Sequence, residues 1–344
     1  MEELESILSV KGIQEEAFVT KMVTSFNEEG YDSMDLDTSR NRFFILAISV
    51  IRNSGLTQFL EVGPGASAKL TNYILSNECR DVMCEYQESS YVVAIEVNAD
   101  SAERARISLH KHNPKRYKLV CGDAVDICNQ DCFKEAFECL VAEVIGFVAS
   151  CEGQCRILHA AAPCLKPHVR FAPRRFATYL TPYTGDLPEA IGTDDAVRIR
   201  HLSFTRLMKN KFVAKDSAAL RIEEWDSTAM GEATSRTFES RMQFPAGVTA
   251  LVGHIRLDQG SETSEWCSSA PWCTAKHRAK NWDNLIIQLS AEFSGREVHL
   301  RSTVSAFTGN PTYKLKFSCA QTGRLFEKEL VFSTTDLVHM RRLG

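Results

Sequence analysis

The spacing of hydrophobic residues changes twice along the chain and divides it into three regions. Over residues 1–54, apolar positions recur every three or four residues, which is typical of helices with one buried face. Over residues 55–175, short apolar runs alternate with helical stretches, as in a parallel sheet covered by helices. Residues 176–344 are richer in alternating and β-rich stretches and predict a separate β domain.

Composition indicates a folded protein of the cell interior. The 344 residues, 44% of them hydrophobic, are enough to build two domains with cores of their own. No apolar stretch approaches the roughly 20 residues that span a membrane, and the acidic N-terminus does not have the basic-then-apolar pattern of a secretion signal. We therefore expect no membrane partner and a cytoplasmic location, with the nucleus left open.

Charge and cysteine spacing argue against two further classes of protein. The formal net charge of −4 and the lack of a long basic run argue against direct binding of nucleic acid. Five of the 12 cysteines fall between residues 128 and 155, but they contain no pair of Cys-x-x-Cys knuckles. We therefore expect buried cysteines in a reducing compartment, and no metal site.

A glycine turn follows the first strand of the predicted parallel sheet. Glu61 lies in that strand, and Gly63 and Gly65 come before a helix, where the absence of side chains lets a ligand approach the backbone closely. A nicotinamide dinucleotide site would have a third glycine at the start of this helix. Alanine and serine occupy residues 66–68 instead, which argues against a bound pyrophosphate.

Acidic residues end the next two strands of the same sheet. Glu96 ends the second strand, where a carboxylate can accept both ribose hydroxyls of an adenosine. Asp123 and Ala124 follow the third strand, where an acid can receive the adenine amino group. In this order the features resemble class I methyltransferases, which implies S-adenosylmethionine as the cofactor and S-adenosylhomocysteine as its product.

Two glutamates, Glu143 and Glu152, bound the loop after the fourth strand. A guanidinium is planar and always protonated, so a pair of carboxylates can hold it bidentately and oppose its charge. Charge drawn toward the carboxylates leaves the remaining terminal nitrogen more nucleophilic. The loop resembles the double-glutamate loop of protein arginine methyltransferases, which implies arginine N-methylation with these two residues as the catalytic pair.

A second stretch with the same resemblance precedes the cofactor domain. Tyr31, Met34, Asp37 and Arg40 are spaced as in a helix motif of that family, and residues three apart share one helix face. The resemblance implies that Met34 lies against the methyl-transfer site and that Arg40 pairs with the cofactor carboxylate. It makes residues 1–54 a helical cap over the cofactor site.

The β domain carries a third match, in residues 238–244, 248–257, 268–271 and 282–289. These stretches resemble the barrel domain of the family. The resemblance implies that residues 176–344 form a β-barrel with a helical dimerisation arm at about 183–212, after a Rossmann-like domain at 55–175. It also implies a homodimer.

The predicted acceptor pocket departs from the family pattern. Asn281 precedes Trp282 where the family has a histidine, and Tyr31 replaces another histidine. Val144 and Ile145 stand where the family has tryptophan and methionine. We expect the pocket to contain Tyr31, Asn281 and Trp282. Because residue 281 is asparagine and not histidine, we do not expect a proton relay through it.

Three functions stay open at this point. The first is methylation of arginine within a protein or peptide, and the second is methylation of free L-arginine or another small guanidino compound, which suits a chain close to the minimal catalytic core. The third is a non-catalytic scaffold that activates a partner methyltransferase subunit. Retention of Glu96, Glu143, Glu152 and Arg40 argues against the scaffold. Methylation of oxygen or carbon would not require two carboxylates around a cation.

Overall fold

The computed structural model describes residues 34–76, 90–130, 133–187, 189, 192, 194–199, 219–229, 235–260, 265–280, 282–307, 310–321, 324–340 and 342–343. These residues form two compact units. The first contains residues 34–35, Ile51–Ala142 and Ala160–Arg170, and the second contains Leu36–Val50, Glu143–His159 and Phe171–Gly344, each without its undescribed residues. The domain boundaries at residues 54 and 175 stay predictions.

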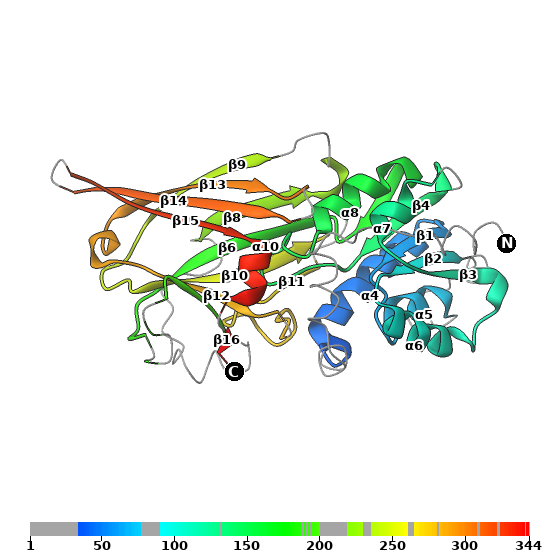
Figure 1. Cartoon of the computed structure of the whole chain (residues 1–344). Coiled ribbons are helices and arrows are strands. Elements are labelled where there is room, and N and C mark those ends of the chain that lie inside the picture. Colours follow the sequence, from blue (N-terminus) through cyan, green and yellow to red (C-terminus); the bar gives the residue numbers. More distant parts are fainter. Residues whose placement is uncertain are drawn as a thin grey trace. The chain divides into compact units, whose positions relative to one another are not determined.

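A five-stranded sheet in the order β3-β2-β1-β4-β5 is the basis of the first unit (Figure 1). Strands β1 to β4 are parallel. Their apolar runs are buried on both faces, as expected of a sheet with helices on both sides. This confirms the predicted Rossmann-like arrangement. The strands are β1 (Gln58–Val62), β2 (Tyr91–Glu96), β3 (Tyr117–Cys121), β4 (Phe137–Ala142) and β5 (Leu165–Ala172).

Short helices follow the strands of this sheet, and side-chain caps fix where two of them begin. Asn98 accepts a hydrogen bond from the Ser101 N–H at the start of one, and Asp123 accepts one from the Val125 N–H at the start of another. The helices are α5 (Lys69–Leu75), α6 (Ala99–Leu109), α7 (Ala124–Cys128), η1 (Pro114–Arg116) and η3 (Ala162–Cys164).

Helix α4 (Thr38–Asn53) begins one residue after Asp37, and this corrects the predicted helix motif. The Asp37 carboxylate accepts a hydrogen bond from the Arg40 N–H at 3.2 Å, as an N-cap does, and the preceding Leu36 is 79% exposed. Met34 and Arg40 therefore do not share one continuous helix face. The sequence signal was an aspartate followed by threonine and serine, a typical helix start.

Two sheets form the second unit. The larger has the order β16-β7-β12-β10-β6-β8 with β11 paired to β10, and the smaller has the order β15-β14-β13-β9. The strands of the larger sheet are β6 (Arg175–Tyr183), β7 (Ala196–Ile199), β8 (Leu220–Asp226), β10 (Ala250–Asp258), β11 (Trp266–Ser268), β12 (Asn284–Gln288) and β16 (Arg342–Leu343). Those of the smaller are β9 (Arg236–Gln243), β13 (Glu297–Ser305), β14 (Thr312–Gln321) and β15 (Arg324–Ser333).

The predicted β domain is confirmed as a region of antiparallel sheets, but its described strands do not close into a barrel. Pairing is antiparallel except between β16 and β7. Four short helices join these strands or flank them: α8 (Gln154–Ala161), α10 (Thr334–His339), η5 (Ser227–Ala229) and η7 (Ala291–Phe293).

The predicted helical arm at 183–212 needs correction over part of its length. Ala196–Ile199 form strand β7 and pair with β12, so these residues are not helical. Strand pairing explains the difference, because a short apolar run fits either element until a partner strand is known. Residues 200–212 lie outside the described part of the chain, and the homodimer stays a prediction.

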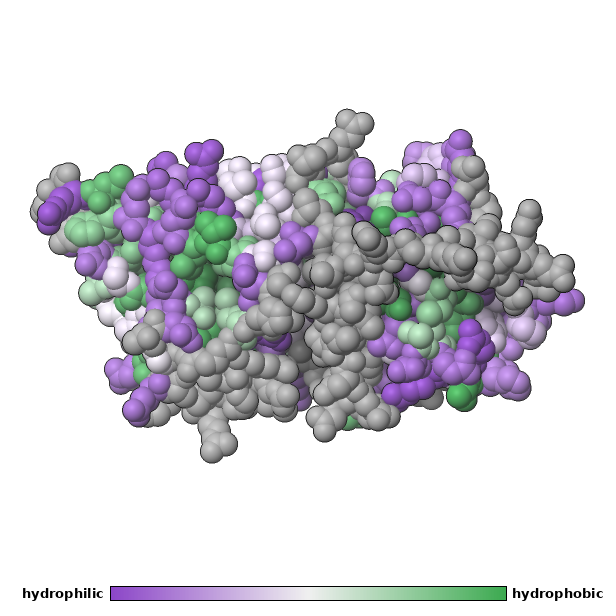
Figure 2. All heavy atoms as spheres, in the orientation of Figure 1, coloured by the Kyte–Doolittle hydropathy of each residue, from purple (hydrophilic) through white to green (hydrophobic). Residues whose placement is uncertain are grey.

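The outer face of the four-stranded sheet carries cross-strand ion pairs alongside exposed hydrophobic residues such as Leu325 and Val331. Lys314 pairs with Glu329 and Lys316 with Glu327 across β14 and β15. Figure 2 shows hydrophilic and hydrophobic side chains mixed over this part of the molecule. No helix in the described residues is long and apolar enough to cross a membrane.

Candidate active site

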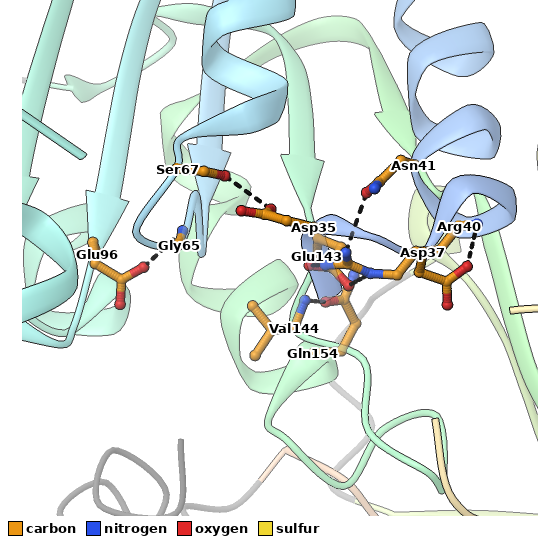
Figure 3. A network of polar contacts seen from close by, with 10 residues as sticks. All are labelled: Asp35, Asp37, Arg40, Asn41, Gly65, Ser67, Glu96, Glu143, Val144 and Gln154. Carbon is orange, nitrogen blue, oxygen red and sulfur yellow. Dashed lines mark hydrogen bonds and ion pairs between the residues drawn. The ribbon is translucent and has the colours of Figure 1, made fainter. Parts of the chain in front are cut away.

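The glycine turn after β1 is closed by the carboxylate at the end of β2. Gly63 and Gly65 have φ values of 77° and 66°, which glycine adopts without steric strain. Glu96 accepts a hydrogen bond from the Gly65 N–H at 3.0 Å (Figure 3). It accepts another from the Asn98 N–H at 2.9 Å. The structure thus brings together the predicted turn and the predicted ribose-binding acid.

Glu61 is a buried acid behind this turn, with one oxygen that has no partner among the described residues. Thr71 donates a hydrogen bond to Oε2 at 2.6 Å, while Oε1 accepts none. Burial raises the pKa of Glu61 to about 7, with a smaller contribution from the Glu96 carboxylate, although the hydrogen bond from Thr71 acts to lower it. An unpartnered buried carboxylate beside a glycine turn suits a cationic ligand, so these residues fit the charged end of S-adenosylmethionine.

The other predicted cofactor residues of this unit have structural contacts of their own. Asp123 caps α7, and Ala124 is the buried first residue of that helix. Met34 is partly buried, and the adjacent Asp35 accepts hydrogen bonds from the Ser67 hydroxyl at 2.8 Å and, through its carbonyl, from the Lys69 ammonium at 2.5 Å. Residues 34–35 therefore lie against the glycine turn, a contact that the sequence did not indicate.

Replacing Glu61 with glutamine is expected to stabilise the protein while weakening cofactor binding. The folded-state pKa of about 7 exceeds the ordinary 4.5, so the folded form loses stability as pH rises across that interval. At roughly 1.4 kcal/mol per pKa unit, the substitution should raise the free energy of unfolding at pH 8 by about 3 kcal/mol at most. Denaturant unfolding at pH 5 and pH 8, with calorimetry of cofactor binding, checks this.

The matched control for this substitution is Glu138→Gln in β4 of the same sheet. Hydrogen bonds from the backbone N–H groups of Thr57 and Gln58 and from Lys166 lower the pKa of Glu138, although its partial burial opposes them. Its neutralisation should therefore lower stability at pH 8. An equal loss of stability in Glu61→Gln and Glu138→Gln would contradict the account given for Glu61.

In the second unit, Arg40 and Glu143 form an ion pair. The Arg40 Nε donates to Glu143 Oε1 at 2.5 Å, and Nη2 contacts Oε2 (Figure 3). Each side chain is only 9% exposed. Arg40 was expected to pair with the cofactor carboxylate. In this structure its guanidinium pairs with the first glutamate of the loop, and its pairing with the cofactor carboxylate stays a prediction.

Glu152 differs from Glu143 because it has no hydrogen bond or ion pair with any described residue. Its side chain is partly exposed. The surrounding protein removes much of the water from this carboxylate and raises the pKa of Glu152 to about 7. The positive charges of Arg198 and Arg40 act to lower this pKa, and the negative charge of Asp283 acts to raise it. A shielded carboxylate of this kind gains most from a cation that arrives with hydrogen-bond donors.

Arg198 and Asp283 form a second charge pair near Glu152. Arg198 Nη2 donates to Asp283 Oδ2 at 2.8 Å, and its guanidinium stacks on the Phe147 ring at 4.3 Å. Sequence analysis missed both. Asp283 could have been suspected from its place directly after Trp282, but nothing in the sequence links β7 to the glutamate loop.

The predicted pocket residues are only partly described. Trp282 is buried at 4% exposure, and Tyr31 and Asn281 lie outside the described residues. The Lys280 N–H next to Asn281 donates to Asp37 Oδ2 at 2.6 Å. This end of the loop is therefore attached to the residue that caps α4.

The fold is that of the protein arginine methyltransferases, with a Rossmann-like sheet followed by antiparallel sheets. A similar solved structure is the Trypanosoma brucei PRMT1 enzyme–prozyme heterotetrameric complex with AdoHcy, at a TM-score of 0.60 and 15% identity over 88% of this chain and 96% of that chain. Another is an open conformation of Arabidopsis thaliana protein arginine methyltransferase 10, at 0.58 and 14% over 90% and 99%. At such identity the likeness establishes the fold alone.

No protein-family model and no curated protein matches the sequence.

Proposed function

We propose that the protein is an S-adenosylmethionine-dependent arginine N-methyltransferase that acts on a terminal guanidino nitrogen. The observation that carries this proposal is Glu152, a shielded carboxylate without a partner among the described residues, nine positions after an already paired Glu143. A planar cation with several N–H donors is the ligand that this environment favours.

Charge balance around Glu152 supports a single cationic acceptor. Glu143 pairs with Arg40 and Asp283 pairs with Arg198, so Glu152 is the carboxylate of this group whose negative charge no described residue pairs. One acceptor guanidinium neutralises this charge. The ion pair with Arg40 holds Glu143 in place, and Glu152 supplies the free carboxylate that opposes the incoming charge.

The first unit supplies residues that suit the methyl donor. Glu96 and the glycine turn fit the adenosine, and Glu61 provides a buried negative charge for the cationic end of the cofactor. S-adenosylmethionine would contribute a sulfonium-bound methyl group there. The similar Trypanosoma brucei complex contains AdoHcy, which agrees with this choice of cofactor.

An acceptor assay tests the proposal. The protein is incubated with methyl-labelled S-adenosylmethionine and an Arg-rich peptide, the same peptide with lysine at every arginine, or free L-arginine. Label on the Arg-rich peptide alone supports protein arginine methylation, and label on free L-arginine supports the small-guanidine alternative. Label on neither, with cofactor binding intact, contradicts guanidino methylation.

A non-catalytic scaffold is the second candidate, and the Arg40–Glu143 ion pair favours it because this pair already satisfies the first glutamate. A scaffold would raise the turnover of an active methyltransferase subunit without methylating an acceptor itself. The enzyme–prozyme assembly of the Trypanosoma brucei structure is a precedent for pairing between chains of this fold. The acceptor assay distinguishes the two candidates.

A further inference from the structure

Glu223 in β8 is a buried carboxylate that binds four hydrogen-bond donors and no cation among the described residues. Oε1 accepts from the Ser150 N–H at 3.1 Å and the Thr178 hydroxyl at 2.8 Å. Oε2 accepts from the Ser150 hydroxyl at 2.5 Å and the Trp225 indole N–H at 2.8 Å. The side chain is fully buried. Hydrogen bonds alone therefore compensate for the burial of this acid.

A β-bulge in β8 places Glu223 in the interior. Thr178 of β6 lies opposite Glu223, but the next residue, Tyr179, lies opposite Arg221, so Ile222 is the extra residue. Ile222 and Glu223 are consecutive and both buried, which a regular strand with one solvent-facing side would not allow. Bulges commonly redirect a side chain next to a functional site.

Two of the four groups that donate to Glu223 belong to Ser150, which lies in the loop between the two predicted catalytic glutamates. The Ala149 N–H donates to the Thr178 hydroxyl at 2.8 Å, and the next N–H, that of Ser150, donates to Glu223 itself. The Tyr313 hydroxyl lies 2.8 Å from the Ser150 hydroxyl. The consecutive N–H groups of Ala149 and Ser150, which lie three and two residues before Glu152, are thus fixed to the β domain.

We propose that Glu223 is the positioning residue of the acceptor loop, and that it sets the place and surroundings of Glu152 through Ser150. The expected effect on acceptor turnover rests on the proposed function. The role of Glu223 in fixing Ser150, and through it Glu152, does not depend on that function. Four donors converge from three segments of the chain on one carboxylate, so the loop cannot shift without breaking several hydrogen bonds. The rate of methyl transfer depends on how precisely the acceptor is placed, so a shift of this loop should lower that rate.

Glutamine at position 223 is the sharpest test, because no orientation of its amide satisfies all the donors. An amide nitrogen in place of Oε1 would face the Ser150 N–H, and in place of Oε2 it would face the Trp225 N–H. Either arrangement sets two donors against each other. Glu223→Gln has almost the same volume as the native side chain, so its effect reports on hydrogen bonding and charge rather than on packing.

Glu223→Gln is expected to lower kcat/KM for the acceptor by about 100-fold and to leave the Kd of the methyl donor within about twofold. A loosened loop also admits water to Glu152, so the pKa of Glu152 should fall from about 7 toward its ordinary 4.5. Carbon-13 NMR of labelled glutamate side chains, assigned with Glu152→Gln, measures this pKa without any need for turnover. The milder Ser150→Ala should act in the same direction, by about tenfold, if Glu223→Gln fails to fold.

Two control variants separate positioning from general destabilisation. Glu224→Gln changes the neighbouring acid, which pairs with Arg221 and is partly exposed, and should change neither quantity. Val298→Ala removes buried volume in β13 and should lower the melting temperature without changing the pKa of Glu152.

An unchanged Glu152 pKa and an unchanged acceptor kcat/KM in both Glu223→Gln and Ser150→Ala would overturn the positioning role. The native protein could methylate no guanidine while Glu223→Gln still changes the pKa of Glu152. That result would reject the proposed function and leave the positioning role of Glu223 intact. The two proposals therefore fail in distinguishable ways.

Discussion

Glu152→Gln is expected to lower kcat for guanidino methylation by about 10³-fold, which corresponds to roughly 4 kcal/mol of transition-state stabilisation. Glutamine keeps the size of the side chain but removes the charge that would oppose the acceptor guanidinium. Glu152 has no hydrogen bond or ion pair with another described residue, so the substitution removes none of the polar contacts that hold the fold together. Methyl-donor affinity, measured by calorimetry, should stay within about twofold.

A matched control for this variant is Glu239→Gln on β9, where the carboxylate is 56% exposed and lies near Arg301 and His299 on the outer sheet face. Surface ion pairs of this kind contribute little, so turnover should not change. Native turnover in Glu152→Gln would reject Glu152 as a catalytic residue. Loss of donor binding together with turnover would indicate a folding defect.

The expected pH dependence of the proposed guanidino methylation follows from the same carboxylate. The pKa of Glu152 is raised to about 7, so a substantial fraction is protonated at neutral pH before an acceptor binds. Only the charged form can oppose a guanidinium, and kcat/KM, which reports free-enzyme groups, should therefore rise tenfold per pH unit below about 7 and level off above it. At saturating methyl donor, where titration of Glu61 does not limit turnover, the acidic limb should be absent from the residual activity of Glu152→Gln.

The cofactor half of the site could be read from the sequence because it depends on local rules. Gly65 and Glu96 follow neighbouring parallel strands, and the carboxyl ends of such strands meet at one edge of the sheet. The apolar runs of β1 to β4 are buried on both faces, so their composition identifies them without knowledge of their partners. The hydrogen bond between Gly65 and Glu96 is the consequence.

For the acceptor half, the sequence predicted the two glutamates and the pocket residues Tyr31, Asn281 and Trp282. It did not predict the charged residues around the glutamates, because their positions depend on long-range pairing. Arg198 approaches Phe147 from β7, which the apolar spacing assigned to a helix. Glu223 is buried because of a bulge, and no periodic pattern reveals which residue of a strand is the extra one. Sequence spacing identified candidate charges, while strand register determined which of them meet.

Gly146→Ala is expected to disable the acceptor loop through steric overlap. The φ angle of Gly146 is not in the left-handed region, so alanine is compatible with the backbone itself. An added Cβ, however, would overlap Cys151 Sγ and would lie 3.0 Å from Glu152 Cγ and 3.1 Å from its Oε1. We expect kcat/KM for the acceptor to fall by about 100-fold and the free energy of unfolding to fall by about 1–3 kcal/mol.

The double variant with Cys151→Ala shows whether overlap is the cause. Removing Sγ eliminates the most severe clash, so Gly146→Ala should cost less stability in the Cys151→Ala background than in the native one, with a coupling energy of about 1 kcal/mol or more. Denaturant unfolding of the four proteins provides the cycle. Additive effects would show that alanine at position 146 acts by some route other than contact with Cys151. The tight approach of Glu152 persists in the double variant, so acceptor turnover should recover less completely than stability does.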